Sequence, residues 1–204
     1  MHGLVIVDKN GEPLRDSIIW CDSRAVNIGS DAYEKLGEDK CMSHLLNSPG
    51  NFTASKLKWV KENEPEVYEK IYKYMLPGDF IAYKLTGEIN TTRNGLSEGI
   101  IWDYKNNEIA NWLLDYYGIN PNLTPDLVDN FTNQGATNSK SSEETGLNIG
   151  IPITYRAGDQ PNNALALNVF DNGEVAASGG TSGVIYSITN DINSKAVSYT
   201  HLTL

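Results

Sequence analysis

The sequence predicts an α/β fold in which short strands near the two ends of the chain flank a helical middle. Three observations support this prediction. Residues 3–8 read as a short apolar strand that leads into the turn signal Asn10-Gly11. Apolar side chains recur at helical spacing between residues 56 and 85. Residues 175–188 read as a strand, a glycine-rich turn and a second strand. The length of 204 residues fits one domain, or one domain and part of another.

The first elements are expected to form a β-hairpin. Residues 3–8 would be the first strand and residues 14–20 the returning strand. Because this strand begins so near the first residue, we expect an earlier part of the sheet to be missing. The first strand would then leave a sheet edge uncovered, which favours association.

The middle of the chain is predicted to be helical. Pro65 and Pro77 suit the first turns of helices, and Gly87 and Gly118 suit their C-terminal ends. In the second helix, Val67, Ile71 and Met75 would share one face. The predicted helices span residues 56–63, 65–75, 77–86 and 108–117.

The later part of the chain is predicted to contain more loops. Residues 119–150 are rich in Asn, Pro, Thr, Ser and Gly, which indicates loops with short strands. Residues 151–155 would form a strand, and residues 164–167 favour a helix. Residues 194–204 fit neither type of element, and we interpret them as a truncation or a cloning scar.

Composition restricts the classes of partner. The net charge of −10 disfavours nucleic acid and anionic lipid. The two cysteines form no Cys-x-x-Cys pair and have no histidine cluster nearby, so we expect reduced thiols and no metal site. No apolar run reaches the length of a membrane span and no signal peptide is recognisable, which predicts a cytoplasmic protein.

Two side-chain-poor loops carry the candidate chemistry. In the second loop, glycine N–H groups and the hydroxyls of Thr181 and Ser182 suit phosphate oxygens, although a tight hairpin alone also explains the glycines. In the first loop, Asp159 is a candidate general base, although capping of the helix that follows also explains an aspartate here, and the two roles are compatible. A nucleotide-dependent dehydrogenase is a weaker alternative, because no Gly-x-Gly-x-x-Gly opens a helix.

Five motifs in a fixed order resemble the FGGY family of carbohydrate kinases, and most closely its members that act on D-xylulose. The resemblance covers residues 1 to about 190. The motifs are Met1-His2-Gly3-Leu4 followed by Trp20-Cys21-Asp22-Ser23-Arg24, the segment 52–63, Leu76-Pro77-Gly78-Asp79-Phe80 with Leu85-Thr86-Gly87, Gly158-Asp159, and Gly180-Thr181-Ser182.

The resemblance implies a ribonuclease-H-like, actin-like fold of two domains with a cleft between them. Residues 1–172 would be the N-terminal, sugar-binding domain without its first strands, and residues 173–190 would begin the C-terminal, nucleotide-binding domain. Residues 191–204 would be a tail unlike the family.

The resemblance also implies roles for single residues. Asp159 would be the general base, and Met1, His2, Asp159 and Gln160 would bind the sugar. Gly180, Thr181 and Ser182 would approach the phosphates of ATP, which is used with Mg²⁺.

The implied reaction is the ATP-dependent phosphorylation of a ketose, D-xylulose to D-xylulose 5-phosphate. Because Gln160 stands where the family often has asparagine, glycerol, ribulose and gluconate remain alternative substrates. The expected partners are the sugar and ATP, and the full-length protein would form a homodimer. Because the first phosphate loop and the adenosine site of the family are not found in residues 1–204, we expect this chain alone to be inactive, and a non-catalytic sugar-binding fragment is the second alternative.

Overall fold

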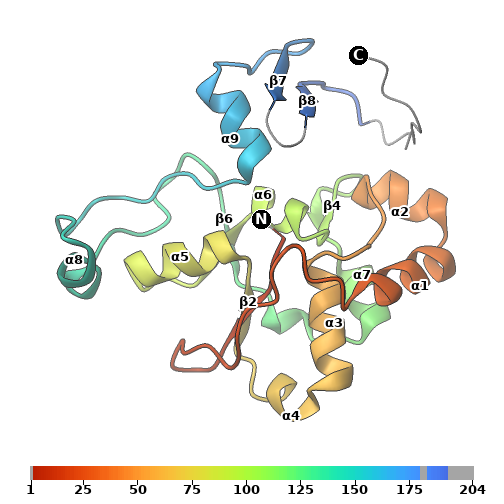
Figure 1. Cartoon of the computed structure of the whole chain (residues 1–204), viewed down its shortest axis with the longest axis horizontal. Helices are drawn as coiled ribbons and strands as arrows, with labels where there is room; N and C mark the ends of the chain where they lie inside the picture. Colours follow the sequence, from red (N-terminus) through yellow and green to blue (C-terminus); the bar gives the residue numbers. More distant parts are fainter. Residues whose placement is uncertain (1, 180–182, 193–204) are drawn as a thin grey trace.

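The computed structural model of the chain describes residues 2–179 and 183–192 (Figure 1). Helices and short strands are interspersed along it, which confirms the predicted mixed α/β class. The helices are α1 (Val26–Leu36), α2 (Glu38–Leu45), α3 (Thr53–Asn63), α4 (Pro65–Tyr68), α5 (Pro77–Thr86), α6 (Arg93–Glu98), α7 (Asn111–Tyr117), the 3₁₀ helix η1 (Pro121–Leu123), α8 (Ser139–Thr145) and α9 (Asp159–Ala166). The strands are β1 (Val5–Val7), β2 (Lys73–Met75), β3 (Asn90–Thr92), β4 (Trp102–Asp103), β5 (Glu108–Ile109), β6 (Asp126–Val128), β7 (Val175–Gly179) and β8 (Gly183–Ser187).

The strands of the described ranges pair two by two. The parallel pair is β3 with β6, and the antiparallel pairs are β1 with β2, β4 with β5, and β7 with β8. None of the helices in these ranges has the length and apolar character needed to cross a membrane.

The predicted turn at Asn10-Gly11 is confirmed, but the predicted returning strand is wrong. Gly11 has a φ of 78° and its N–H donates to the Asp8 carbonyl at 3.0 Å. The returning segment then runs beside β1 through isolated bridges, Val7 to Pro13 and Leu4 to Ile18. Proline has no N–H to donate, so a regular ladder cannot start there.

The expected uncovered edge of the first strand is also wrong. On one side, β1 pairs with β2 in the register Val5 to Met75. On the other side, the Leu14 N–H donates to the Ile6 carbonyl at 3.0 Å, and Leu4, the residue before β1, exchanges hydrogen bonds of 2.9 and 3.0 Å with Ile18. Both edges of β1 are therefore covered within the described chain.

The middle helices are confirmed in α3 and α5, and Gly87 ends α5 with a left-handed φ of 84°. The predicted helix 65–75 is wrong in its second half, since α4 ends at Tyr68 and Met75 belongs to β2. Pairing with β1 outweighs the helical spacing of Val67, Ile71 and Met75.

Two further predicted elements need correction. The helix expected over residues 108–117 starts only at Asn111, because Glu108 and Ile109 form β5 against β4. The strand expected over residues 151–155 is reduced to one bridge between Ala136 and Pro152.

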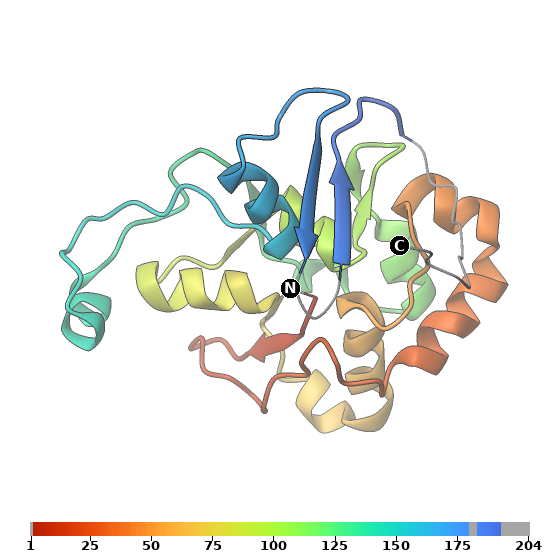
Figure 2. The ribbon, with the colours of Figure 1, turned by 45° about the horizontal axis from the view of Figure 1, so that its top comes forward.

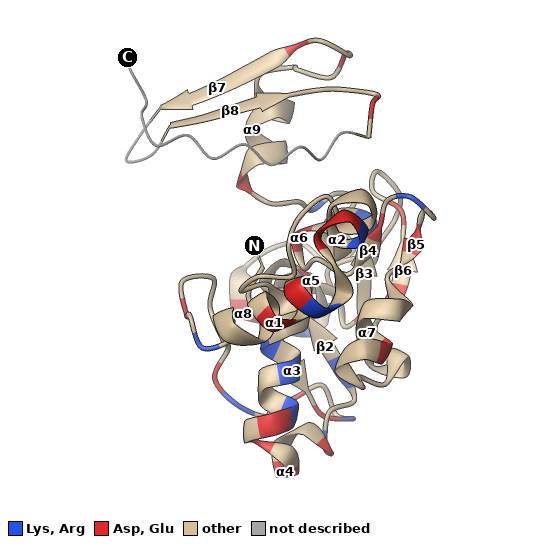
Figure 3. Cartoon of the chain, turned by 90° about the vertical axis from the view of Figure 1, so that its right-hand side faces the viewer, with Lys and Arg blue, Asp and Glu red and all other residues tan. Residues whose placement is uncertain are grey.

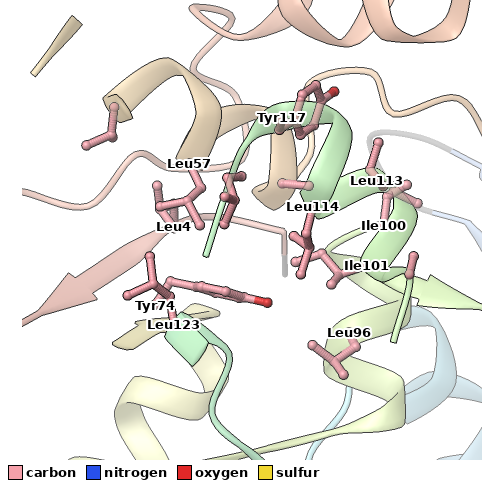
Figure 4. Packing of buried hydrophobic residues seen from close by; sticks show 14 of the residues in the cluster. Leu4, Leu57, Tyr74, Leu96, Ile100, Ile101, Leu113, Leu114, Tyr117 and Leu123 are labelled. Atoms are coloured by element: carbon pink, nitrogen blue, oxygen red, sulfur yellow. The ribbon is translucent and has the colours of Figure 1, made fainter. Parts of the chain in front are cut away.

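The hydrophobic core lies where β1, β2, α3, α6 and α7 meet. Figure 4 shows Leu4, Leu57, Tyr74 and Leu114 converging from these elements. Their side chains are at most 1% exposed. The same cluster continues through α6 and Ile101 to η1. We call residues 2–156, which contain this core, the body.

The last described elements form a separate group, which we call the terminal lobe (residues 159–188). It consists of α9 and the hairpin of β7 and β8, whose register runs from Val175–Ser187 to Gly179–Gly183. The two predicted strands are confirmed, and the predicted turn residues Gly180, Thr181 and Ser182 lie outside the described residues. Figures 1 and 3 show the lobe at one end of the molecule, and Figure 2 shows the hairpin beside α9. The domain boundary at residue 172 stays a prediction.

Candidate functional site

A cleft of about 420 Å³ lies between the body and the terminal lobe. Its lining includes His2, Phe52, Ser97, Glu98 and Tyr104 from the body, and Asp159, Gln160, Pro161 and Tyr186 from the lobe. The structure therefore brings His2 together with Asp159 and Gln160, although these residues stand far apart in the sequence. Met1, which was predicted to join them, lies outside the described residues.

His2 reaches the cleft from the segment that precedes β1. Its ring packs against Phe52 with the ring centroids 4.6 Å apart. Burial lowers the pKa of His2, and the nearby Lys56 ammonium lowers it further, while a hydrogen bond to the Trp20 backbone and the charge of Asp159 oppose the shift. The lowered pKa favours the neutral imidazole, in which one nitrogen donates and the other accepts a hydrogen bond.

Helix α3 holds the backbone of this histidine and of the residue that follows it. The fully buried Lys56 donates from Nζ to the His2 carbonyl at 3.3 Å, and Thr53 donates from its hydroxyl to the Gly3 carbonyl at 3.2 Å. Burial lowers the pKa of Lys56, and the charge of Asp22 raises it. The motif at residues 52–63 thus fixes the motif that begins the chain.

The motif Trp20 to Arg24 folds onto the same helix. Arg24 forms an ion pair with Asp22 at 2.7 Å and lies 4.5 Å above the Trp59 ring. The side-chain hydrogen bonds from Arg24 lower the pKa of Asp22 to about 2. Asn51 ties this turn to the start of α3, since its amide donates to the Asp22 carbonyl at 2.5 Å.

Asp159 is the first residue of α9, and the alternative that it caps this helix is wrong. The capping position is Gly158, and no side chain caps the helix. The Asp159 carboxylate accepts a hydrogen bond from the N–H of its neighbour Gln160 at 3.0 Å and is exposed to the cleft. A carboxylate in this place can accept a proton from a bound hydroxyl.

Glu98, at the end of α6, is a cleft residue that the sequence did not single out. Its carboxylate accepts a hydrogen bond from the Gly158 N–H. Burial raises the pKa of Glu98, and the charge of Asp159 raises it further. A Cβ atom at position 158 would lie 1.7 Å from Glu98 Oε1, so only glycine allows this close approach. Glu98 stands in a stretch of mixed polar and apolar residues that carried no periodic signal.

The cleft offers polar groups of several kinds above apolar and aromatic side chains. The polar groups are two carboxylates, one imidazole, two amides and the hydroxyls of a serine and two tyrosines, and the apolar surface includes Phe52 and Ile100. Such a lining suits a small molecule with several hydroxyl groups. Among the residues that the structure describes, no group of three His, Cys, Asp or Glu side chains could hold a metal ion.

Comparison with known proteins shows the class to which this fold and cleft belong. The sequence profile described as the N-terminal domain of the FGGY family of carbohydrate kinases matches residues 1–166. The chain belongs to this family.

Its similar relatives include several xylulose kinases. The xylulose kinase of Staphylococcus xylosus is 32% identical over 191 residues, which are 93% of this chain and 40% of that protein. The xylulose kinase of Bacillus subtilis is 31% identical over 192 residues, which are 92% of this chain and 38% of that protein. The chain thus spans about 40% of the length of these curated relatives.

Solved structures show the same fold. The xylulose kinase from Rhodospirillum rubrum has a TM-score of 0.81 at 27% identity, over 90% of this chain and 38% of that one. A Plasmodium falciparum glycerol kinase, whose structure was solved with ADP, also has a TM-score of 0.81, at 22% identity over 90% of this chain and 37% of that one. At this identity the glycerol kinase shows the shared fold alone.

Proposed function

We propose that this chain is the sugar-binding part of an ATP-dependent carbohydrate kinase that phosphorylates D-xylulose to D-xylulose 5-phosphate. The observation that carries the proposal is one cleft lined by His2, Asp159 and Gln160. The names of the relatives support the choice of D-xylulose as the substrate. In this proposal the fold is the ribonuclease-H-like one, with residues 1–172 as the sugar-binding domain and residues 173–190 as the start of the nucleotide-binding domain.

The proposed reaction starts with a sugar hydroxyl next to the Asp159 carboxylate. As the hydroxyl oxygen forms a bond to the γ-phosphorus of ATP, its proton passes to Asp159 and the bond from that phosphorus to ADP breaks. His2 as a neutral imidazole and Gln160 as an amide would hold further hydroxyls. Phosphoryl transfer depends on positioning and charge neutralisation, so a rigid sugar site is the contribution of this chain.

The phosphate side of the proposal concerns the turn of the lobe hairpin. Gly180, Thr181 and Ser182 would bind ATP phosphates through backbone N–H groups and hydroxyls. Mg²⁺, when bound with the nucleotide, would neutralise phosphate charge. The strands β7 and β8 pair as far as Gly179 and Gly183, the described residues on either side of this loop.

The test is sugar-dependent ADP release by the protein in the full form that its gene encodes. D-xylulose, D-ribulose, glycerol and D-gluconate are compared with Mg²⁺-ATP in excess. We expect the highest kcat/KM with D-xylulose, and we expect Asp159→Asn to lower kcat by about 10²- to 10⁴-fold. If the kcat/KM is highest with another of these compounds, that compound and not D-xylulose is the substrate. Sugar binding without turnover would indicate a binding protein. Unchanged activity of Asp159→Asn would remove Asp159 as the base.

A further inference from the structure

The turn that carries Asp159 is anchored to the body by Arg156. The guanidinium donates from Nε to Asp79 Oδ1 at 2.9 Å and from one terminal nitrogen to Gln134 Oε1 at 3.1 Å. The other terminal nitrogen donates to the Asn90 carbonyl at 2.9 Å and to its Oδ1 at 2.6 Å. Arg156 therefore joins the turn to α5, to β3 and to the loop before α8.

The Asp79 carboxylate, which pairs with Arg156, is buried and accepts further hydrogen bonds. Asp79 is 3% exposed, and its Oδ2 accepts hydrogen bonds from the Thr91 hydroxyl at 2.9 Å and the Leu76 N–H at 3.4 Å. Burial raises the pKa of Asp79, while Arg156 and Thr91 lower it. A buried ion pair of this kind is costly to break, because removal of one partner leaves the other charge without compensation.

A second contact holds the same turn from the side of α6. Glu98 accepts a hydrogen bond from the N–H of Gly158. Gly158 directly precedes Asp159, the proposed base. A small cavity of about 30 Å³ separates the two anchors and is lined by Asp79, Arg156, Glu98 and Gly158. Because residues 156 and 158 are both fixed, the position of residue 159 is narrowly determined.

We propose that Asp79, Arg156 and Glu98 are positioning residues that hold the Asp159 carboxylate against the sugar hydroxyl. The inference rests on the proposed function, in which Asp159 is the base. It also gives a role to the Leu-Pro-Gly-Asp-Phe motif, which contains Asp79. Asp79 and Arg156 line the small cavity and not the cleft, so they act on the base and not on the sugar.

The decisive variant is Arg156→Met, with Arg156→Lys as the conservative partner. A displacement of about 1 Å in a catalytic group can cost on the order of 10²-fold in rate, so we expect Arg156→Met to lower kcat by about 10- to 100-fold. The KM for D-xylulose should rise by less than kcat falls, because His2 and the other cleft residues of the body keep their places. Arg156→Lys keeps one charged donor and should recover part of kcat.

The matched control is Arg15→Met. Arg15 forms an ion pair with Glu64 at 2.8 Å that is also partly buried, with exposed fractions of 19% and 27%, but neither residue lines the cleft. This variant should lose stability and keep the kcat of the parent protein. Parental kcat in a folded Arg156→Met protein, or an equal loss in Arg15→Met, would overturn the inference. Asp159→Asn is measured in parallel, since loss of activity there with retained activity in Arg156→Met refutes only the positioning role.

A second set of variants keeps the test valid if Arg156→Met does not fold. Glu98→Gln retains an oxygen acceptor for the Gly158 N–H, and Glu98→Ala does not. We expect Glu98→Ala and Gly158→Ala each to lower kcat more than Glu98→Gln does. Because Glu98 also lines the cleft, the KM for D-xylulose is measured for each variant, and a positioning role predicts that kcat falls more than KM rises. Because both alanine variants break the same contact, the double variant should be no worse than Gly158→Ala alone. Losses that multiply in the double variant would contradict the shared contact.

Discussion

The body and the terminal lobe bury their apolar side chains to very different extents. In the body, Leu57 and Leu113 are completely buried within a cluster that extends from Leu4 to Leu123. In the lobe, Ile185 is 79% exposed and Val175 is 55% exposed. The body therefore has a core of its own, whereas the described lobe has little apolar burial to stabilise it. The polar anchors of Arg156 and Glu98 thus matter more for the position of Asp159 than packing inside the lobe does.

The largest effect on stability is expected from Leu57→Ala in the body. This change leaves a cavity in a close-packed core and should lower the free energy of unfolding by about 2–5 kcal/mol. The matching change in the lobe, Ile185→Ala, should alter it by less than about 0.5 kcal/mol, because the side chain is already in water. Urea unfolding followed by tryptophan fluorescence measures both. Equal losses would show that Ile185 is buried in solution and that the contrast between the two regions is false.

A smaller effect is expected at Asp103, a buried carboxylate of the body. It accepts hydrogen bonds from the Asn106 N–H at 2.9 Å and the Trp112 indole at 2.9 Å, and it lies 2.8 Å from His44 Nδ1. Burial alone would raise the pKa of Asp103, but these hydrogen bonds lower it below its usual value. Asp103→Asn should lower the free energy of unfolding by about 1–3 kcal/mol at pH 7.

The pH dependence of this loss has a definite sign. A carboxyl whose pKa is lowered by folding stabilises the protein above its unfolded pKa, and the contribution is lost as the pH falls through the folded pKa. The difference in Tm between the parent protein and Asp103→Asn should therefore have its largest value at pH 7 and become smaller below about pH 4. A difference that stays constant down to pH 2 would exclude this electrostatic contribution.

Part of the fold could be predicted because some helices carry their own boundaries. Pro77 and Gly87 mark the ends of α5, and apolar spacing marks α3. Asn138 carries an equally local signal, since its side chain accepts the Ser141 N–H at 3.0 Å to start α8. The strands of two or three residues, such as β4 and β5, are too short to show a period, and their existence depends on the partner strand.

The candidate site, like the fold, could be predicted from the sequence only in part. His2, Asp159 and Gln160 were found through motifs that resemble a family, and the structure places all three in the cleft. Glu98 and the ion pair of Asp79 with Arg156 were not found, because the pair joins residues 77 positions apart in the sequence. Such contacts depend on how the body packs, and no local sequence pattern predicts them.

The pKa of His2 tests whether the body and the terminal lobe face each other across one cleft. NMR titration of the ring, assigned with His2→Gln, should give a pKa below the usual histidine value of about 6.5. Because the charge of Asp159 raises this pKa, Asp159→Asn should lower it further. Because the Lys56 ammonium lowers it, Lys56→Met should raise it, and the control Lys58→Met, which removes the partner of Glu62 on α3, should leave it unchanged. A His2 pKa that does not respond to Asp159→Asn would contradict the account, since Asp159 would then not face His2 across one cleft.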